Sequence, residues 1–333
     1  MSRYLVTGAT GFLGRHLVSV LLSGGHQVVA LCRKEPADFA GKEGFSVARG
    51  DVLDAESVKR AAEGCEGLFH CAGRVSRRPE DAEALFRVHV EGTKITLDAA
   101  RAAGVRRVVL ASTSGTVAVS RERKVIDETA LAPQDVIARW PYYRSKLYAE
   151  RAGLDRSGPG FEVVSVNPSL LLGPGDVLGS STGDVVKFME KRVPMIPSGG
   201  LSFVDARDAA ATMVVAMEKG RAGEKYLLGA KNLTFEMFFG MLERVTGVKG
   251  PSVKAPKSLL LAQAGAEIME RIAKRMNTES PIDRVSAEMS QHYWYLDAKK
   301  ATRELGFAPR DAIETLSDTV KDLRERGVVW PKD

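Results

Sequence analysis

A tyrosine and a lysine stand four positions apart in the segment PYYRSK, which runs from residue 141 to residue 146. Pro141 suits the first turn of a helix, and residues four apart in a helix share one face, so Tyr142 and Lys146 would lie side by side. A free tyrosine has a pKa near 10, and lowering it by about three units takes ~4 kcal/mol of preferential stabilisation of the phenolate. A neighbouring ammonium group can supply that stabilisation, so the pair predicts acid/base chemistry by Tyr142 at a carbonyl or alcohol oxygen. Tyr143 lacks such a partner, because position 147 is leucine.

A hydroxyl group that polarises the same oxygen is expected at the end of the preceding strand. That strand ends in Ser112, Thr113 and Ser114, which gives three candidates. Serine and threonine also cap turns through the nearby backbone, and a lone hydroxyl at a strand end more often has only that role. The position of these three residues before the helix with Tyr142 and Lys146 favours a role in catalysis.

The strand-like run Arg3–Thr7 leads directly into the loop GATGFLG and then into a helical pattern. Three glycines at this spacing allow a tight turn, close approach of the backbone to a pyrophosphate, and close packing of helix on strand. The amino end of the helix favours negative charge. The order of strand, loop and helix therefore predicts a dinucleotide site with these contacts: Gly8, Thr10, Gly11, Phe12, Leu13 and Gly14.

The residues after the second strand indicate which dinucleotide binds. Folds that prefer NAD place a carboxylate there for the ribose hydroxyls, but this chain has Cys32, Arg33 and Lys34. Arg33 and Lys34 could pair with the 2′-phosphate of NADP, although two cations after a strand are often only a solvated turn. We expect NADP(H), with NAD(H) as the alternative. Asp51, beside Val52 after the third strand, either accepts a hydrogen bond from the adenine amino group or caps the helix that follows.

Short β-branched runs alternate with helical patterns through the first half of the chain. The expected strands are 3–7, 27–31, 45–49, 67–71, 106–112 and 161–167. This order is typical of an α/β fold with a Rossmann-type, doubly wound parallel sheet, in which ligands bind beyond the carboxyl ends of the strands. The motifs above fall at such ends.

After residue 168 the alternation gives way to Gly/Pro-rich connections, which predicts a smaller, mostly helical substrate-binding subdomain. We assign residues 1–168, with about 200–228 returning, to the NADP-binding domain, and about 169–199 and 229–333 to the subdomain. The stretch Lys257–Met276 has apolar residues on one helical face and charged residues on another. Such a helix covers a core or a cleft or, less often, lies on a membrane surface.

Composition narrows the class of protein. At 333 residues and 44% hydrophobic content, the chain can form one large α/β domain and a smaller one. Cys32, Cys65 and Cys71 form no C-x-x-C pair, so we expect reduced thiols, no metal site and a cytoplasmic protein. We expect neither a signal peptide nor a membrane-spanning segment, since no apolar run approaches ~18 residues. The net charge of +6 is spread along the chain, which disfavours nucleic acid and favours an anionic small molecule.

Taken together, these motifs resemble the extended short-chain dehydrogenase/reductase family, part of the NAD-dependent epimerase/dehydratase superfamily. Within it, the chain is similar to the dihydroflavonol-4-reductase-like and 3β-hydroxysteroid-dehydrogenase-like branch. Further segments that carry the resemblance are HCAG at 70–73, Ala149-Glu150, Asn167-Pro168, GPGD at 173–176, FVDARD at 203–208, and 294–310. The resemblance thus covers nearly the whole chain.

The resemblance implies roles for individual residues. Tyr142 matches the general acid/base, and Lys146 matches its electrostatic partner and a ribose ligand. Thr113 matches the carbonyl donor, with Ser114 as the next candidate. Additional positions expected to line the cofactor are Ala72, Gly73 and Pro168.

One position departs from the family pattern. Many members have asparagine before Val-x-Gly-Thr, where this chain has His89. We expect a structural histidine with satisfied hydrogen bonds. Ser114, Trp140 and Leu170 flank the chemistry and are candidates for substrate contact, although each could equally be ordinary packing.

Our first hypothesis is an NADPH-dependent reductase of a ketone or aldehyde on an apolar or aromatic skeleton, or the reverse oxidation. The alternative is an NAD-dependent nucleotide-sugar epimerase, which the lack of an acidic residue at Cys32 disfavours. A non-catalytic NADP-binding sensor is a third possibility, although such proteins commonly lose the tyrosine or the lysine. A nucleotide-sugar dehydratase is disfavoured, because Ser114-Gly115 follow Thr113 where dehydratases have Asp-Glu. The resemblance also implies a homodimer through helices beside the sheet.

Overall fold

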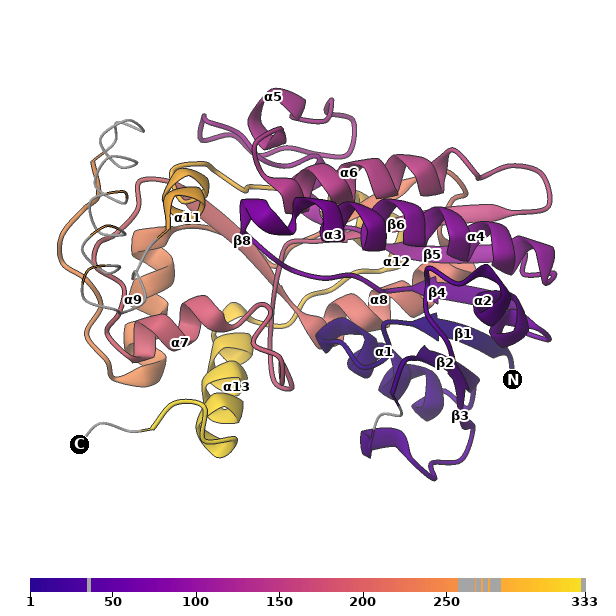
Figure 1. Cartoon of the computed structure of the whole chain (residues 1–333). Helices are drawn as coiled ribbons and strands as arrows, with labels where there is room; N and C mark the ends of the chain where they lie inside the picture. The colour runs from indigo at the N-terminus through magenta and orange to yellow at the C-terminus, as the bar shows by residue number, and fades with distance from the viewer. Residues whose placement is uncertain (35–36, 257–266, 268–270, 272–274, 276–282, 331–333) are drawn as a thin grey trace.

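The structure is a computed structural model that describes residues 1–34, 37–256 and 283–330, with positions 267, 271 and 275. Its main sheet has seven parallel strands in the order β3-β2-β1-β4-β5-β6-β9 (Figure 1). The strands are β1 (Arg3–Thr7), β2 (Gln27–Cys32), β3 (Phe45–Arg49), β4 (Gly67–His70), β5 (Arg107–Ala111), β6 (Glu162–Pro168) and β9 (Lys225–Leu228). This confirms the predicted Rossmann-type sheet, and the strand order reverses between β1 and β4, where ligands bind in such folds.

Helices cover both faces of this sheet (Figure 1). On one face lie α1 (Phe12–Ser23), α8 (Ala206–Lys219) and α12 (Lys299–Leu305); on the other lie α2 (Ala55–Ala62), α4 (Gly92–Ala102) and α6 (Pro141–Leu154). Each face has its own apolar core, with Leu17 and Met213 in the first and Val58 and Leu97 in the second. Because both faces are covered, the strands are almost continuously apolar.

The helical segment that follows β4 has an irregular middle. The helix α3 (Ala82–Phe86) continues through a π turn (Arg87–Glu91) into α4. His89 lies in this turn and is buried. Single π turns within α-helices often occur at functional sites, because the extra residue in the turn redirects side chains.

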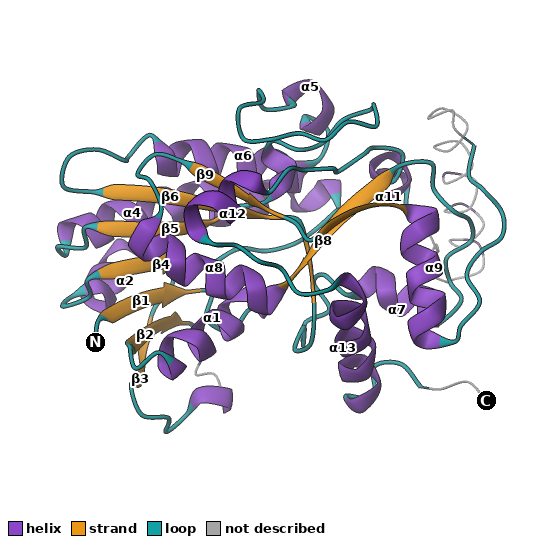
Figure 2. Ribbon diagram, turned by 180° about the vertical axis from the view of Figure 1, so that it is seen from behind, coloured by secondary structure: helices purple, strands orange, loops and turns teal. Residues whose placement is uncertain are grey.

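A smaller sheet has the order β10-β8-β7, formed by β7 (Leu170–Leu172), β8 (Gly200–Asp205) and β10 (Lys231–Thr234) (Figure 2). The helices α7 (Gly183–Met189), α9 (Phe235–Thr246) and α13 (Ala312–Glu325) share its apolar core, which includes Phe188, Phe203 and Leu316. The predicted subdomain therefore contains a sheet as well as helices. The described part of the chain also contains two short helices, α5 (Gln134–Ile137) and α11 (Arg284–Met289).

The segment 200–228, expected to return to the dinucleotide-binding domain, is divided between the two sheets. α8 packs on the main sheet and β9 pairs with β6, whereas β8 pairs with β7 and β10. The chain passes from one unit to the other where β8 ends and α8 begins, and the carboxylate of Asp205 accepts the N–H of Arg207 there. The helix predicted at Lys257–Met276 lies outside the described residues, apart from three isolated positions. No helix in the described part is both long and apolar enough to cross a membrane.

Candidate active site

The glycine loop after β1 is shaped by contacts that leave no room for side chains. Gly8 has a φ of +70°, and a Cβ there would lie 2.6 Å from the amide nitrogen of Ala72. A Cβ on Gly14 would collide with the carbonyl oxygen of Gly8. The Gly11 N–H donates to the Gly8 carbonyl over 2.9 Å and closes the turn. The loop thus holds the start of α1 close to the carboxyl ends of β1 and β4.

The first turn of α1 presents N–H groups that no side chain caps. Its N-cap is Gly11, and its first turn contains no acidic residue. By contrast, α2 and α8 begin at Asp54 and Asp205, whose carboxylates accept helical N–H groups. Uncapped N–H groups with the positive end of the helix dipole suit a phosphate. The glycine loop therefore fits the pyrophosphate of a dinucleotide. The predicted contact residues Thr10, Phe12 and Leu13 lie in the same loop and in the first turn of α1.

Arg33 and Lys34 lie directly after β2 and are exposed. Neither forms a hydrogen bond or an ion pair with any described residue. Asp51 accepts the N–H of Leu53 over 3.0 Å, so it caps its own turn, while Asp54 caps α2. Contact of Asp51 with adenine stays a prediction. Two exposed cations are thus available directly after β2.

Tyr142 and Lys146 lie in the first two turns of α6, which begins at Pro141 as predicted. The Lys146 ammonium is buried and donates to the carbonyl of Ala111, at the end of β5, over 2.6 Å. Burial lowers the pKa of Lys146 to about 8, while the carboxylate of Glu150 opposes that shift. The helix thus brings both predicted side chains to the carboxyl edge of the sheet.

Burial raises the pKa of the Tyr142 phenol in this structure. This acts against the lowering predicted from the sequence, which relied on Lys146 together with the positive charge of an oxidised nicotinamide. The physical reason is that the phenol is desolvated while the Lys146 ammonium is directed at a backbone carbonyl. Tyr142 is therefore protonated at neutral pH and is able to donate a proton.

The three candidate hydroxyl groups at the end of β5 lie in different surroundings. Ser112 is buried and donates to the carboxylate of Glu150, so its hydroxyl faces the interior. Thr113 is half-buried, and its hydroxyl accepts only a long hydrogen bond of 3.4 Å from the Gly115 N–H. Ser114 is buried in the short turn that follows. Thr113 is therefore the most available donor of the three.

Glu150 is a buried acceptor that joins the ends of three neighbouring strands to α6. One oxygen accepts hydrogen bonds from Ser112, Thr116 (3.0 Å) and Asn167, and the other pairs with the Lys225 ammonium over 2.9 Å. A buried carboxylate needs such partners. In the sequence, Glu150 is notable only as part of the Ala149-Glu150 motif. Its position four residues after the lysine, on the same helical face, was the signal that could have indicated its role.

Two buried histidines, His70 and His89, lie near the carboxyl end of β4. His70 contacts the hydroxyls of Thr7 (2.8 Å) and Thr93 (3.1 Å), and Thr7 accepts the N–H of Ala72 over 3.2 Å. This network fixes the backbone after β4. His89 also has both ring nitrogens hydrogen-bonded, which agrees with the expectation of a satisfied structural histidine.

Trp140 and Leu170, two of the three candidate substrate residues, lie mainly in packed surroundings. Trp140 is only 1% exposed and packs against Tyr143, His292 and Trp294, with ring centroids 6.0, 5.1 and 5.5 Å away. Leu170 is half-buried in β7 and packs on the core of the smaller unit. In this structure Trp140 therefore supports Tyr143 and offers almost no surface of its own.

An ion pair that the sequence did not indicate connects the two units near Tyr143. The guanidinium of Arg77, which follows β4, donates to the carboxylate of Asp184 in α7 over 3.0 Å and to the hydroxyl of Ser286 in α11 over 3.2 Å. Arg77 and Asp184 are 107 positions apart, so no local pattern could reveal their contact.

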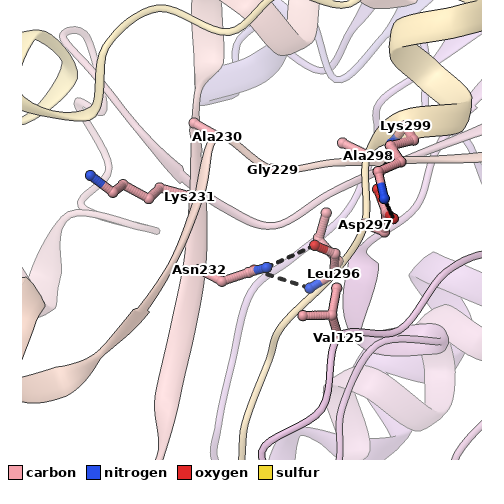
Figure 3. Close-up of a pocket in the computed structure, with 9 residues that line it drawn as sticks. All are labelled: Val125, Gly229, Ala230, Lys231, Asn232, Leu296, Asp297, Ala298 and Lys299. Carbon is pink, nitrogen blue, oxygen red and sulfur yellow. Dashed lines mark hydrogen bonds and ion pairs between the residues drawn. The ribbon is translucent and has the colours of Figure 1, made fainter.

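A pocket of about 320 Å³ lies outside this set of residues (Figure 3). Its lining is Val125, Gly229, Ala230, Lys231, Asn232, Leu296, Asp297, Ala298 and Lys299. Asn232 exchanges two hydrogen bonds with the backbone of Leu296, and Lys299 pairs with Asp297 over 3.0 Å. Several of its polar groups are therefore already paired with one another.

A glycine loop that opens a Rossmann-type sheet, with a tyrosine and a lysine at the same edge, defines a short-chain dehydrogenase/reductase architecture. Residues 4–229 match the model of the NAD dependent epimerase/dehydratase family. The chain is 32% identical over 332 residues to a dihydroflavonol 4-reductase-like protein of Synechocystis, with 98% of this chain and 96% of that protein covered. It is 33% identical over 335 residues to sterol demethylase protein B of Methylococcus capsulatus, with 98% and 99% covered.

Among solved structures, the chain is similar to the crystal structure of gox2253, with a TM-score of 0.84 and 30% identity over 98% of this chain and 99% of that one. The chain belongs to the NAD-dependent epimerase/dehydratase family, within the extended short-chain dehydrogenases/reductases. This confirms the resemblance seen in the sequence. The protein is an NAD(P)-dependent enzyme of this type, acting on a carbonyl or hydroxyl group.

Proposed function

We propose that the protein is an NADPH-dependent reductase of a ketone or aldehyde, with Tyr142 as the general acid. The observation that carries this proposal is the arrangement at the carboxyl edge of the sheet. A half-buried Thr113 hydroxyl, a protonated phenol and a buried ammonium lie where β5 ends and α6 begins, at the same edge of the sheet as a loop suited to a pyrophosphate.

In this mechanism, each side chain has one task at the carbonyl. The bound dinucleotide supplies a hydride to the carbonyl carbon. Tyr142 donates its hydroxyl proton to the carbonyl oxygen, and Thr113, or Ser114 beside it, donates a hydrogen bond to the same oxygen. The Lys146 ammonium stabilises the phenolate that remains and holds the ribose. Burial raises the pKa of Tyr142, so the phenol holds its proton at neutral pH and has it to donate.

The cofactor assignment rests on the residues after β2. Arg33 and Lys34 are exposed and unpaired among the described residues, so they are available to a 2′-phosphate. The pyrophosphate is assigned to the glycine loop. The remaining cofactor contacts that we propose are Val52, Ala72, Gly73 and Pro168.

The substrate that we propose has an apolar or aromatic skeleton. The aromatic rings of Tyr142, Tyr143 and Trp294 form a continuous series, with centroids 5.0 and 4.8 Å apart. Such rings suit flat, apolar molecules. The similarity to a dihydroflavonol 4-reductase-like protein supports a reductase of this kind.

A fluorescence titration with NADPH and with NADH tests the proposal. Wild-type protein should bind NADPH more tightly, and Arg33→Ala should weaken NADPH by about 10- to 100-fold, since a charge-assisted hydrogen bond contributes about 1.5–3 kcal/mol. NADH affinity should stay unchanged. Arg60→Ala, an exposed cation in the last turn of α2, is the matched control. Preference for NADH, or NAD that copurifies and does not exchange, would contradict the proposal and favour the epimerase alternative.

A further inference from the structure

His89 lies at the point where the helix formed by α3 and α4 widens into a π turn. The wide turn packs against α6, and the imidazole ring is 2% exposed. A π turn gives up regular helical hydrogen bonding, so it persists where the surrounding contacts compensate for it. The contacts of the buried His89 side chain can supply that compensation.

The hydrogen bonds of His89 define its tautomer. The N–H of Arg74 donates to Nε2 over 3.0 Å, so Nε2 carries no proton. The proton of the neutral ring is then on Nδ1, which donates to the hydroxyl of Ser145 over 2.8 Å. The Ser145 hydroxyl in turn donates to the carbonyl oxygen of Tyr142 over 2.8 Å. The chain of donors runs in one direction, from the segment after β4 to the first turn of α6.

The same ring also touches both segments directly. Its edge faces the ring of Tyr142, with centroids 5.7 Å apart and planes at 79°. A Cβ on Gly73 would lie 3.3 Å from Nε2, which shows how closely the ring approaches the backbone after β4. One side chain thus spans the distance between a segment expected to line the cofactor and the residue expected to donate the proton.

We propose that His89 is a positioning residue, which fixes Tyr142 relative to the backbone at Gly73 and Arg74 through Ser145 and through its own ring. This inference rests on the proposed role of Tyr142 as the general acid. His89 itself holds its proton and does not pass it to the substrate.

The electrostatic surroundings are consistent with a ring that stays neutral. Burial lowers the pKa of His89 to about 3, and the positive charge of Lys146 lowers it further. A second proton would also have to sit on Nε2, opposite the Arg74 N–H. The ring therefore keeps one tautomer through the pH range in which such an enzyme works.

The first test is the reduction of cinnamaldehyde and of benzaldehyde by NADPH with the His89→Phe variant. Phenylalanine keeps the ring but removes both hydrogen bonds. The kcat should fall by about 10- to 100-fold, because a small displacement of a catalytic group costs that much. The KM and the Kd for NADPH should stay within about threefold. His89→Asn, which can restore one of the two hydrogen bonds, should recover part of the kcat. His26→Asn, a histidine at the opposite edge of the sheet, should behave as wild type.

Ser145→Ala removes the hydroxyl that joins the His89 ring to the Tyr142 carbonyl, and so breaks the same chain of hydrogen bonds. Its loss of kcat and that of His89→Phe should not add in the double variant, since both break one chain of hydrogen bonds. Assays are run well below the melting temperature of each variant, so that a lower stability does not by itself reduce kcat.

A second readout needs no substrate. Nitrogen-15 NMR of histidine-labelled protein should show His89 protonated at Nδ1 and unprotonated at Nε2 from pH 5 to pH 9. Titration of His89 within that range would overturn the inference. So would a wild-type kcat in His89→Phe when Tyr142→Phe has lost activity, and in that case the proposed function would stand. Full activity of Tyr142→Phe would instead refute the proposed function.

Discussion

The two sides of the active-site edge are built from different parts of the chain. On the cofactor side, consecutive strand ends contribute backbone, and Gly8 and Gly14 are packed so tightly that neither accepts a Cβ. On the substrate side, side chains from segments far apart meet, as in the contact of Arg77 with Asp184 and the ring of Tyr143 on Trp294. The backbone of the first side leaves little freedom for substitution.

Glycines outside the glycine loop vary in their surroundings. A Cβ on Gly183 in α7 or on Gly240 in α9 would have no atom within 4 Å, whereas a Cβ on Gly199 would collide with the carbonyl oxygen of His292. The loop at Gly8 and Gly14 therefore depends on backbone geometry, while α7 and α9 have room for a side chain at these two positions. One scaffold of this kind can keep its dinucleotide while its substrate changes.

The largest effect is expected where the two sides meet, at Tyr142. Tyr142→Phe should lower kcat about a thousandfold, because it removes the transferred proton. The Kd for NADPH should change by no more than a few fold, since little binding is lost. Stopped-flow reduction and fluorescence titration measure the two quantities. Tyr148→Phe, an exposed tyrosine on the same helix, is the matched control. Retention of most activity by Tyr142→Phe would end the acid/base assignment.

The next largest effect is expected at Gly14 in the glycine loop, compared with Gly240 in α9. Gly14→Ala should weaken NADPH binding by about 10- to 100-fold, because the new methyl group collides with the Gly8 carbonyl and strain of this kind costs about 1–3 kcal/mol. Gly240→Ala, on the other side, should leave NADPH affinity unchanged and raise the free energy of unfolding by about 0.5–1 kcal/mol, as expected in a helix interior. Titration and denaturant unfolding give the two values. Equal effects of the two substitutions on NADPH would remove the distinction.

Local patterns in the sequence were sufficient to predict the glycine loop and the placement of Tyr142 and Lys146 on one helix. The strand, glycine loop and helix are adjacent in the chain, and Tyr142 and Lys146 are one helical turn apart. The strand β9 and the small sheet were not indicated, because their strands are short and pair with distant segments.

The remaining features depend on tertiary contacts that no local pattern contains. Glu150 pairs with Lys225, 75 positions away, and His89 contacts Ser145, 56 positions away. The pKa of Tyr142 also depends on burial, which raises it and which spacing alone does not report. The sequence was thus sufficient to predict which groups react, while the structure was needed for the contacts that hold them.

The smallest effect is a shift of a pH profile through Glu150. Its carboxylate opposes the burial that lowers the pKa of Lys146 to about 8, so the ammonium is charged below that pH and loses its proton as the pH rises through it. Glu150→Gln removes the negative charge, lowers the pKa of Lys146 further, and should move the decline of kcat at high pH to a lower pH, with a loss of a few fold at pH 7.

Substitution of Lys225, the ion-pair partner of Glu150, separates the effect of charge on Lys146 from the effect on stability. Lys225→Met should reduce the free energy of unfolding by about 3–5 kcal/mol, because it leaves the buried Glu150 carboxylate without its cation. Glu150→Gln should reduce it by less, because the Lys225 side chain is 25% exposed. Lys225→Met keeps the Glu150 carboxylate and removes a positive charge, so it should move the decline of kcat to a higher pH. Profiles of kcat from pH 6 to pH 10, recorded well below the melting temperatures, distinguish the two. If both variants moved the profile in one direction, Glu150 would act by supporting the fold and not by setting the charge on Lys146.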